Sequence, residues 1–523
     1  MEVSEATIPL NWTKTSPSVY ERAIADFEKF FLFIAVVGQG RPDRQNWNTA
    51  TGIRIETKRD DFVGDVKEAW RALRYDHPCF AAIIEGDRWL YHVADEQELS
   101  VWMEETFHVH NVHQTARELF PFETNPSRRT VLHVLPRTQE LVLQGPHTHV
   151  DGIGMTTFFD NLLRFLVAPS RKEPTWGDEG KNLTPPLTIT AKIPECTAEQ
   201  KHAWDANLSH YLAQFPTVRV HNENAGDPAK TTKLRWLRFT RAETTSIAAQ
   251  SKSLGFSVTA AAQSAISHAA RIHGHLVDAI STHSTFAIYD ARAFIDPREY
   301  PSRTLVGPHI FSMPAVFPII GGANGFCETA KRAGEIFVDF KTRDDDLMRA
   351  TSPFWATEIP AALSTPMPEG TPVAADLQLS SVGILDRHLK TTYSHPHDTA
   401  DGGGENRAAR SPIDVHGIWV ALDMLSPNIA VEMWTFRGEL CIELIYNEAF
   451  HREESVDLLC RLLHEQLQQG LGVNVGLDVR APGPREEGGK GVLGIGEPVT
   501  MEGLGKGGLV TTVAQVVGDV EVV

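Results

Sequence analysis

The stretch Leu141–Met155, which reads LVLQGPHTHVDGIGM, constrains the fold more than any other part of the chain. Its apolar beginning has the pattern of a buried strand and stops at Gly145-Pro146. Apolar residues then recur at steps of three and four, which predicts one buried face of a helix from about Ile153. These residues are Met155, Phe158, Phe159, Leu162, Leu163 and Leu166. The polar residues between the two elements therefore lie at a strand-to-helix turn, where α/β folds expose side chains to a crevice.

The polar residues of this turn, His147, His149 and Asp151, fit more than one interpretation. Asp151 can simply cap the helix that follows. His147, Asp151 and Gly152 also form H-x-x-x-D-G, which resembles the signature of a large acyltransferase superfamily. Plant acyl-CoA transferases, peptide-synthetase condensation domains and fungal trichothecene O-acetyltransferases belong to it. Together with His149 the turn forms H-x-H-x-D, which resembles the start of the metallo-β-lactamase-like metal site, although that site continues with histidine where this chain has Gly152. The motif is too short to decide by itself.

Further segments resemble parts of the acyltransferase superfamily and follow in its order. An amphipathic helix over residues 60–74, a His-Pro turn and a strand over residues 80–84 are similar to its N-terminal part. Residues 175–185 resemble a segment of fungal enzymes of the trichothecene 15-O-acetyltransferase type. In the second half, a strand over residues 234–239 leads into the capping box Thr240–Glu243, and a G-x-S-V-T turn then starts an alanine-rich helix. This order favours the acyltransferase interpretation of the polar turn.

Two motifs of the second half resemble site elements of the superfamily. Tyr289-Asp-Ala-Arg292 is similar to the D/N-x-R strand, and the resemblance implies that Arg292 forms an ion pair with Asp151. Leu377–Ile384 resembles the S-N-x-G element that borders the tunnel in condensation-type members, with Ser381 in place of the asparagine. We therefore expect Ser381 and Gly383 at the tunnel and Gly152 as structural support of the site.

The resemblance implies an α/β fold of two chloramphenicol-acetyltransferase-like sandwich domains with a tunnel between them. Acyl-CoA, expected to be acetyl-CoA, would enter as cosubstrate, with no permanently bound cofactor and no metal. The acceptor would be a hydroxyl group of a hydrophobic secondary metabolite, a terpenoid or polyketide. An alcohol attacks a thioester poorly unless a positioned base removes its proton, and histidine titrates in the right range. His147 is the expected base, and Asp151 would fix the turn that aims it.

Two alternatives remain open at this stage. A metallo-β-lactamase-like hydrolase would use His147, His149 and Asp151 as metal ligands. A condensation-type enzyme would take its acyl group from a carrier protein, although no carrier domain is recognisable in the sequence.

The length of 523 residues favours two α/β domains or one large pseudo-duplicated unit. We expect an N-terminal half over residues 1–225, a C-terminal half over residues 226–470, and a tail over residues 471–523. The tail is rich in Gly and Val and contains no Phe, Trp or Tyr, so we expect it to be disordered or loosely attached. Residues 19–37 are predicted to form a short helix followed by a strand, and the polar, glycine-rich residues 393–411 an exposed insertion.

The composition limits which binding partners and which cellular compartment are expected. The formal net charge of −18 argues against nucleic acid or an anionic membrane as the main partner. Five cysteines without a C-x-x-C pair indicate a reducing compartment, and the apolar run Phe30–Val37 is too short to span a bilayer. We expect a cytoplasmic monomer that binds small molecules. Five basic residues form a local concentration that could meet the CoA phosphates or lie on a solvated face: Lys233, Arg235, Arg238, Arg241 and Lys252.

Overall fold

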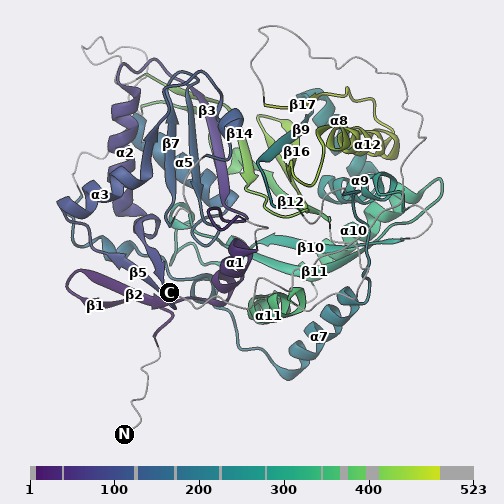
Figure 1. The fold of residues 1–523 in the computed structure, drawn as a ribbon, viewed down its shortest axis with the longest axis horizontal. Coiled ribbons are helices and arrows are strands. Elements are labelled where there is room, and N and C mark those ends of the chain that lie inside the picture. Colours follow the sequence, from purple (N-terminus) through teal and green to yellow (C-terminus); the bar gives the residue numbers. More distant parts are fainter. Residues whose placement is uncertain are drawn as a thin grey trace.

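The chain forms two α/β units that lie side by side (Figure 1). The computed structural model describes residues 8–37, 41–122, 128–169, 174–222, 227–276, 280–342, 345–364, 375–395 and 411–482. Within these ranges, the first unit is built on a six-stranded sheet in the order β13-β14-β3-β8-β7-β6, and the second on a five-stranded sheet in the order β12-β15-β16-β9-β17. The α/β class predicted from the sequence is confirmed.

The sheet of the first unit consists of β13 (Thr392–Tyr393), β14 (Ile413–Leu422), β3 (Thr49–Glu56), β8 (Glu140–Gly145), β7 (Val131–Leu135) and β6 (Phe107–Val109). The helices of this half are α1 (Asp26–Val36), α2 (Phe62–Asp76), α3 (Glu96–Thr106), α4 (Ala116–Leu119), α5 (Gly152–Val167), α6 (Leu187–Thr190) and α7 (Ala198–Leu212). A smaller sheet contains β1 (Thr13–Ser16), β2 (Val19–Ala23), β5 (Arg88–His92) and β4 (Ile83–Glu85). Helices α2 and α5 pack together through Trp70 and Phe158, whose ring centroids are 5.3 Å apart.

The second unit combines its five-stranded sheet with a hairpin. The sheet consists of β12 (Leu377–Ile384), β15 (Ile429–Phe436), β16 (Glu439–Asn447), β9 (Thr232–Arg238) and β17 (Val479–Arg480), and the hairpin of β10 (Thr282–Asp290) and β11 (Ile310–Pro318). The helices are α8 (Arg241–Ser253), α9 (Val258–His273), α10 (Gly325–Thr342), α11 (Asp345–Leu363) and α12 (Glu453–Leu471). Helix α9 buries its alanines between α10 and α12, because a small side chain allows helices to approach closely.

Strands β13 and β14 cross from the second half of the sequence into the first sheet. Ile418 of β14 pairs with Ile53 of β3 in an antiparallel ladder. The two units therefore interlock, and a division of the sequence at residues 225 and 226 does not separate their strands.

Residues 19–37 form a strand and then a helix, the reverse of the predicted order. Phe27, Phe30, Phe31 and Ile34 of α1 are spaced as one helical face and are all buried. The Glu28 side chain accepts a hydrogen bond from the Ala25 N–H at 2.8 Å, which caps the helix. The apolar run that the sequence suggested as a strand is thus the buried face of α1.

The predicted tail begins within the packed structure. Leu471 ends α12, and Leu471, Val473 and Val475 are buried in the core of the second unit. Strand β17 then pairs with β9. The expectation of a loosely attached segment is therefore wrong for residues 471–482, because three aliphatic side chains suffice to anchor it. Residues 483–523, and most of the predicted insertion at residues 393–411, lie outside the described residues.

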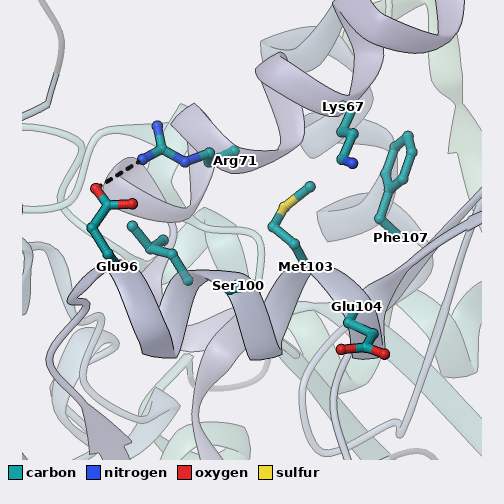
Figure 2. A pocket seen from close by; sticks show the side chains of 8 residues that line it. Lys67, Arg71, Glu96, Ser100, Met103, Glu104 and Phe107 are labelled. Carbon is teal, nitrogen blue, oxygen red and sulfur yellow. Dashed lines mark ion pairs between the residues drawn. The ribbon is translucent and has the colours of Figure 1, made fainter.

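A surface hollow of about 550 Å³ lies between α2 and α3, far in sequence from the polar turn (Figure 2). Arg71 and Glu96 form an ion pair of 3.6 Å across it, and both side chains are exposed. Exposed pairs of this kind contribute little stability. The hollow contains none of the residues that the sequence singles out.

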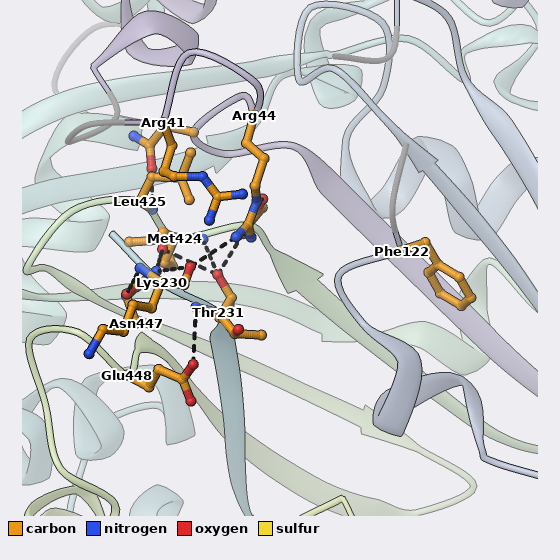
Figure 3. A network of polar contacts seen from close by, with 12 residues as sticks. Arg41, Arg44, Phe122, Lys230, Thr231, Met424, Leu425, Asn447 and Glu448 are labelled. Carbon is orange, nitrogen blue, oxygen red and sulfur yellow. Dashed lines mark hydrogen bonds and ion pairs between the residues drawn. The ribbon is translucent and has the colours of Figure 1, made fainter. Parts of the chain in front are cut away.

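A polar network fixes the segment after α1 against both units (Figure 3). Arg44 donates from Nε to Asp423 at 2.8 Å, and Asp423 also accepts from the Thr232 hydroxyl. The Asn447 side chain donates to the Met424 carbonyl at 2.8 Å. The backbone carbonyl of Asp423 accepts from the Trp47 N–H at 2.8 Å. The network thereby holds Trp47, which lines the cavity described below.

Among the described residues, no helix combines the length and the apolar character that a membrane span requires.

Candidate active site

A cavity of about 260 Å³ lies between the two units, and His147 is part of its wall. One side of the cavity is aromatic and is formed mainly by α1 and α11. Its rings are Phe27, Phe30, Phe31, Trp47 and Trp355. The other side is formed by polar groups of β12 and β15, among them Ser380, Ser381 and Glu432. The cavity is therefore suited to a hydrophobic molecule with a few polar groups.

The strand-to-helix turn brings His147 to this cavity as the sequence predicts. Strand β8 ends at Gly145 and α5 begins at Gly152. The turn is closed by a hydrogen bond of 2.9 Å from the His149 N–H to the Pro146 carbonyl. The loop between the two elements is short, so β8 and α5 together fix the position of His147.

The imidazole of His147 is held between aromatic rings. The Phe31 ring stacks on it with a centroid distance of 4.3 Å and an interplanar angle of 10°, and Trp47 lies 6.4 Å away. Nδ1 is enclosed without a hydrogen-bond partner among the described residues, so Nε2 is the nitrogen that can face the cavity. Burial lowers the pKa of His147, although the nearby charge of Asp151 opposes this. The ring is therefore neutral at pH 7 and able to accept a proton.

Asp151 forms the ion pair with Arg292 that the sequence predicts, across 141 residues of chain. Asp151 Oδ1 accepts from Arg292 Nη2 at 2.8 Å and from the Gly154 N–H at 2.6 Å, where it caps α5. Asp151 Oδ2 accepts from Arg292 Nη1 at 3.1 Å and from the His309 N–H at 2.8 Å. Burial alone would raise the pKa of Asp151, but Arg292 and the hydrogen bonds hold it below its usual value. With its oxygens occupied, Asp151 fixes the turn and is not available as a base.

Arg292 ties this pair to the second unit. Its guanidinium also donates to the carbonyls of Leu305 and Gly307 at 3.1 Å and 2.9 Å, and to Asp290 at 3.1 Å. Both members of the Asp151–Arg292 pair are buried. A buried pair with so many partners holds one geometry.

Two glycines of the turn differ in their steric demands. Gly152 lines the cavity, and an added Cβ would contact Val420 at 3.2 Å, which is tight. At Gly154 an added Cβ would lie 2.1 Å from the Val306 carbonyl oxygen. Gly154, which the sequence did not single out, is therefore the stricter requirement for the close approach of α5 to residue 306.

His149 points away from the cavity. Its Nε2 lies 3.1 Å from the Ala82 carbonyl and its Nδ1 3.0 Å from the Thr148 hydroxyl, and its ring packs edge-on against Trp89. Burial lowers its pKa to about 4. His149 is thus a neutral, hydrogen-bonded core histidine.

This arrangement contradicts the metal-hydrolase interpretation. A metal site would require His147, His149 and Asp151 to converge on one point. Instead, both ring nitrogens of His149 have other partners, and Arg292 occupies Asp151. No cluster of three or more His, Cys, Asp or Glu suited to a metal ion occurs in the described part of the chain.

Ser381 and Gly383 line the cavity where β12 departs from regular pairing. The register of β12 against β15 shifts between these residues, and Gly383 has φ +87°, a left-handed conformation that favours glycine. The Ser381 hydroxyl lies 3.1 Å from that of Thr259 at the start of α9. The irregular strand therefore opens its edge toward the cavity.

The basic concentration of the second half is largely committed to ion pairs. Arg235 is buried and pairs with Asp457 at 3.0 Å, and Arg238 pairs with Glu439. Lys233 lies 3.4 Å from Glu448. Arg241 and Lys252, both exposed on α8, are the members of this set with no ion pair among the described residues.

Sequence reasoning missed Phe31, Trp47 and Glu432. The aromatic residues have ordinary helical or loop surroundings, so only the packing shows their role. The sequence could have indicated Glu432, because an acidic residue is unusual within an apolar strand such as IAVEMWTF.

The fold is that of the chloramphenicol-acetyltransferase-like acyltransferases, with His147 and Asp151 at the junction of the two units. The TRI3 trichothecene 15-O-acetyltransferase of Fusarium sporotrichioides has the same fold, with a TM-score of 0.71 at 17% identity over 89% of this chain and 99% of that chain. The first condensation domain of the calcium-dependent antibiotic synthetase gives a TM-score of 0.59 at 12% identity, over 87% of this chain and 99% of that one.

Two sequence relatives have names that agree with this relationship. The chain is 21% identical to the O-acetyltransferase pigM of Monascus ruber, over 89% of this chain and 88% of the relative. It is 23% identical to the acetyltransferase pigO of the same organism, over 88% and 98%. A relative from Epichloe uncinata, named loline biosynthesis cluster 1 transcription factor lolU1, is 22% identical over 90% and 98%. No protein-family model matches the sequence.

Proposed function

We propose that this protein is an O-acetyltransferase that moves the acetyl group of acetyl-CoA to a hydroxyl of a hydrophobic secondary metabolite, a terpenoid or polyketide. The observation that carries the proposal is the imidazole of His147, held by Phe31 and by the Asp151 turn in the wall of a largely aromatic cavity. The names of pigM, pigO and TRI3 support acetyl transfer in secondary metabolism. We further propose that the protein works as a cytoplasmic monomer.

The geometry suits direct transfer without a covalent enzyme intermediate. Nε2 of His147 takes the proton of the acceptor hydroxyl while the hydroxyl oxygen attacks the thioester carbonyl. The tetrahedral adduct collapses as the carbon–sulfur bond breaks, and His147 returns the proton to the departing thiolate, which gives the acetyl ester and free CoA. The low pKa of a buried histidine favours the neutral ring that begins this cycle.

The test compares two histidines of the same turn. His147→Ala should lower acetyl transfer by about 10²–10⁴-fold, the usual contribution of a general base. Binding of acetyl-CoA, measured by calorimetry, should change less than a few-fold, because the proton transfer matters in the transition state and hardly in the ground state. Acetyl transfer is scored by the mass increase of hydroxylated terpenoid and polyketide acceptors.

His149→Ala is the matched control. It should reduce stability, because the Ala82 carbonyl loses its partner, while turnover per folded molecule stays within a few-fold. Equal loss of turnover in both variants, or an active His147→Ala protein, would remove the proposed role. Transfer from a carrier-bound acyl group but not from acetyl-CoA would favour a condensation-type reaction.

A further inference from the structure

Glu432 is a buried acid in the wall of the same cavity. It lies in the middle of β15, with 4% of its surface exposed. Its Oε2 atom is enclosed and has no hydrogen-bond partner within the described residues. An unsatisfied buried carboxyl oxygen costs free energy. Oε2 itself is closed off, so the remaining exposed part of Glu432, which lines the cavity, is what a bound molecule would contact.

The register of the sheet explains why Glu432 has no counter-ion among the described residues. Glu432 pairs with Ser380 of β12 on one side and with Glu443 of β16 on the other. Two buried acids thus lie next to each other in one row. Arg117 is the cation next to Glu443. It donates a hydrogen bond to Glu443 at 2.9 Å and stacks over the ring of Trp236. Arg117 therefore forms its ion pair with Glu443, and Glu432 has no counter-ion in the described part of the chain.

A buried carboxyl group without a counter-ion is more stable in its neutral, protonated form. Burial raises the pKa of Glu432 to about 8, with a smaller contribution from the negative charge of Glu443, while Ser380 acts in the opposite direction. At pH 7 the group is mainly a neutral carboxylic acid, and such an acid carries a proton that it can donate in a hydrogen bond.

We propose that Glu432 determines acceptor specificity by donating a hydrogen bond to a carbonyl oxygen, so that the preferred acceptors are hydroxyketones or hydroxylactones and not plain hydrophobic alcohols. This inference rests on the proposed function, because it places the acceptor in the cavity of His147. A carbonyl oxygen satisfies the carboxyl without requiring any group to ionise.

An ammonium group fits less well. It would require Glu432 to lose its proton, and it would itself lose its hydration on entering a cavity between aromatic rings. A ketone oxygen loses far less hydration. The balance therefore favours a neutral oxygen acceptor over a cation.

The test uses three probes that share one hydrocarbon frame: decalinol, its hydroxydecalone regioisomers and aminodecalinol. Binding is measured by calorimetry, independently of turnover, in the wild type, Glu432→Gln and Glu432→Leu. In the wild type, at least one hydroxydecalone should bind about 10–100-fold more tightly than decalinol, because only the ketone oxygen gives the buried carboxyl a hydrogen-bond partner. This ratio should fall to about one in Glu432→Leu.

Glu432→Gln keeps a donor of similar shape and should retain most of the ratio. It also separates recognition from a structural role through pH: the wild-type preference for the hydroxydecalone should weaken as pH rises through about 8, and the Glu432→Gln preference should stay constant. The other titratable or charged groups around the cavity and the acid row are His147, Asp151, Asp290, Arg387, His388, Glu443 and Arg117.

The outcomes distinguish this inference from the proposed function. Equal binding of hydroxydecalone and decalinol in the wild type, or an unchanged ratio in Glu432→Leu, overturns the role of Glu432 even if acetyl transfer is observed. Preferential binding of aminodecalinol that is lost in Glu432→Leu also overturns it, in favour of a cation site. If the hydroxydecalone preference depends on Glu432 but no acetyl transfer is observed, the role of Glu432 is supported and the proposed acetyl transfer is overturned.

Discussion

Phe31 of α1 stacks on His147 with ring centroids 4.3 Å apart and ring planes 10° from parallel. This contact joins an N-terminal helix to the turn between β8 and α5, more than a hundred residues later in the chain. It covers one face of the imidazole and excludes water from it. Two properties of the proposed base, its fixed orientation and its low pKa, follow from this position.

The pH dependence of the reaction should report the burial of His147. Burial holds its pKa in the folded protein below the usual 6.5, so the midpoint of its protonation lies below pH 6.5. With an acceptor that lacks a carbonyl, kcat/KM should fall as pH is lowered, and the midpoint of this fall should lie below pH 6.5. If the fall of kcat/KM toward low pH (the acid limb of the profile) were centred at pH 7 or above, it would contradict a lowered pKa of His147.

Phe31→Leu should weaken catalysis by loosening the imidazole. We expect kcat/KM to fall about 10-fold, because small displacements of a reacting group are costly. Water would also reach the ring, so the acid limb should move up toward pH 6.5. Phe33→Leu on the same helix removes a ring that does not line the cavity and is the matched control. Similar effects of both substitutions would show that α1 acts only through general stability.

The Asp151–Arg292 pair should be strongly coupled. Asp151→Asn or Arg292→Ala alone should lower the free energy of unfolding by about 3–5 kcal/mol, because each leaves a buried charge without its partner. The double variant should lose less than the sum. Asp296→Asn, in the exposed pair with Arg298, should change the free energy of unfolding little. Chemical denaturation measures all four, and additive losses would argue against coupling.

Local patterns predicted much of this fold. The spacing of apolar residues in α5 and the capping box of Thr240 and Glu243 depend on neighbours a few residues apart, and the structure contains both. The Asp151–Arg292 pair spans 141 residues, and only a family resemblance indicated it. The crossover of β14 and the cross-strand row of Ser380, Glu432 and Glu443 depend on sheet register, which no local pattern encodes.

A chain that ends at Gly470 should be less stable than one that ends at Pro482. The shorter chain lacks Leu471, Val473 and Val475, whose burial contributes roughly 1.5–3 kcal/mol each. It also lacks the Gly476 N–H, which donates to Glu243 at 2.6 Å. Thermal unfolding of the two truncated proteins measures the difference. Equal midpoints would show that residues 471–482 contribute nothing to the core.

Glu432→Gln should stabilise the protein, and more so at high pH. The pKa of Glu432 is raised from 4.5 to about 8 on folding, so between these values the folded state keeps a proton that the unfolded state has lost. Wild-type stability therefore decreases as pH rises through this window, by up to about 1.4 kcal/mol per pH unit. Glutamine does not titrate, so the advantage of the variant should grow from pH 5 to pH 8. Glu439→Gln, in a partly exposed ion pair on the neighbouring strand, should show a small and nearly constant difference. Unfolding free energies at four pH values decide the matter: a difference for Glu432→Gln that does not change with pH would show that this carboxyl is already ionised in the folded protein.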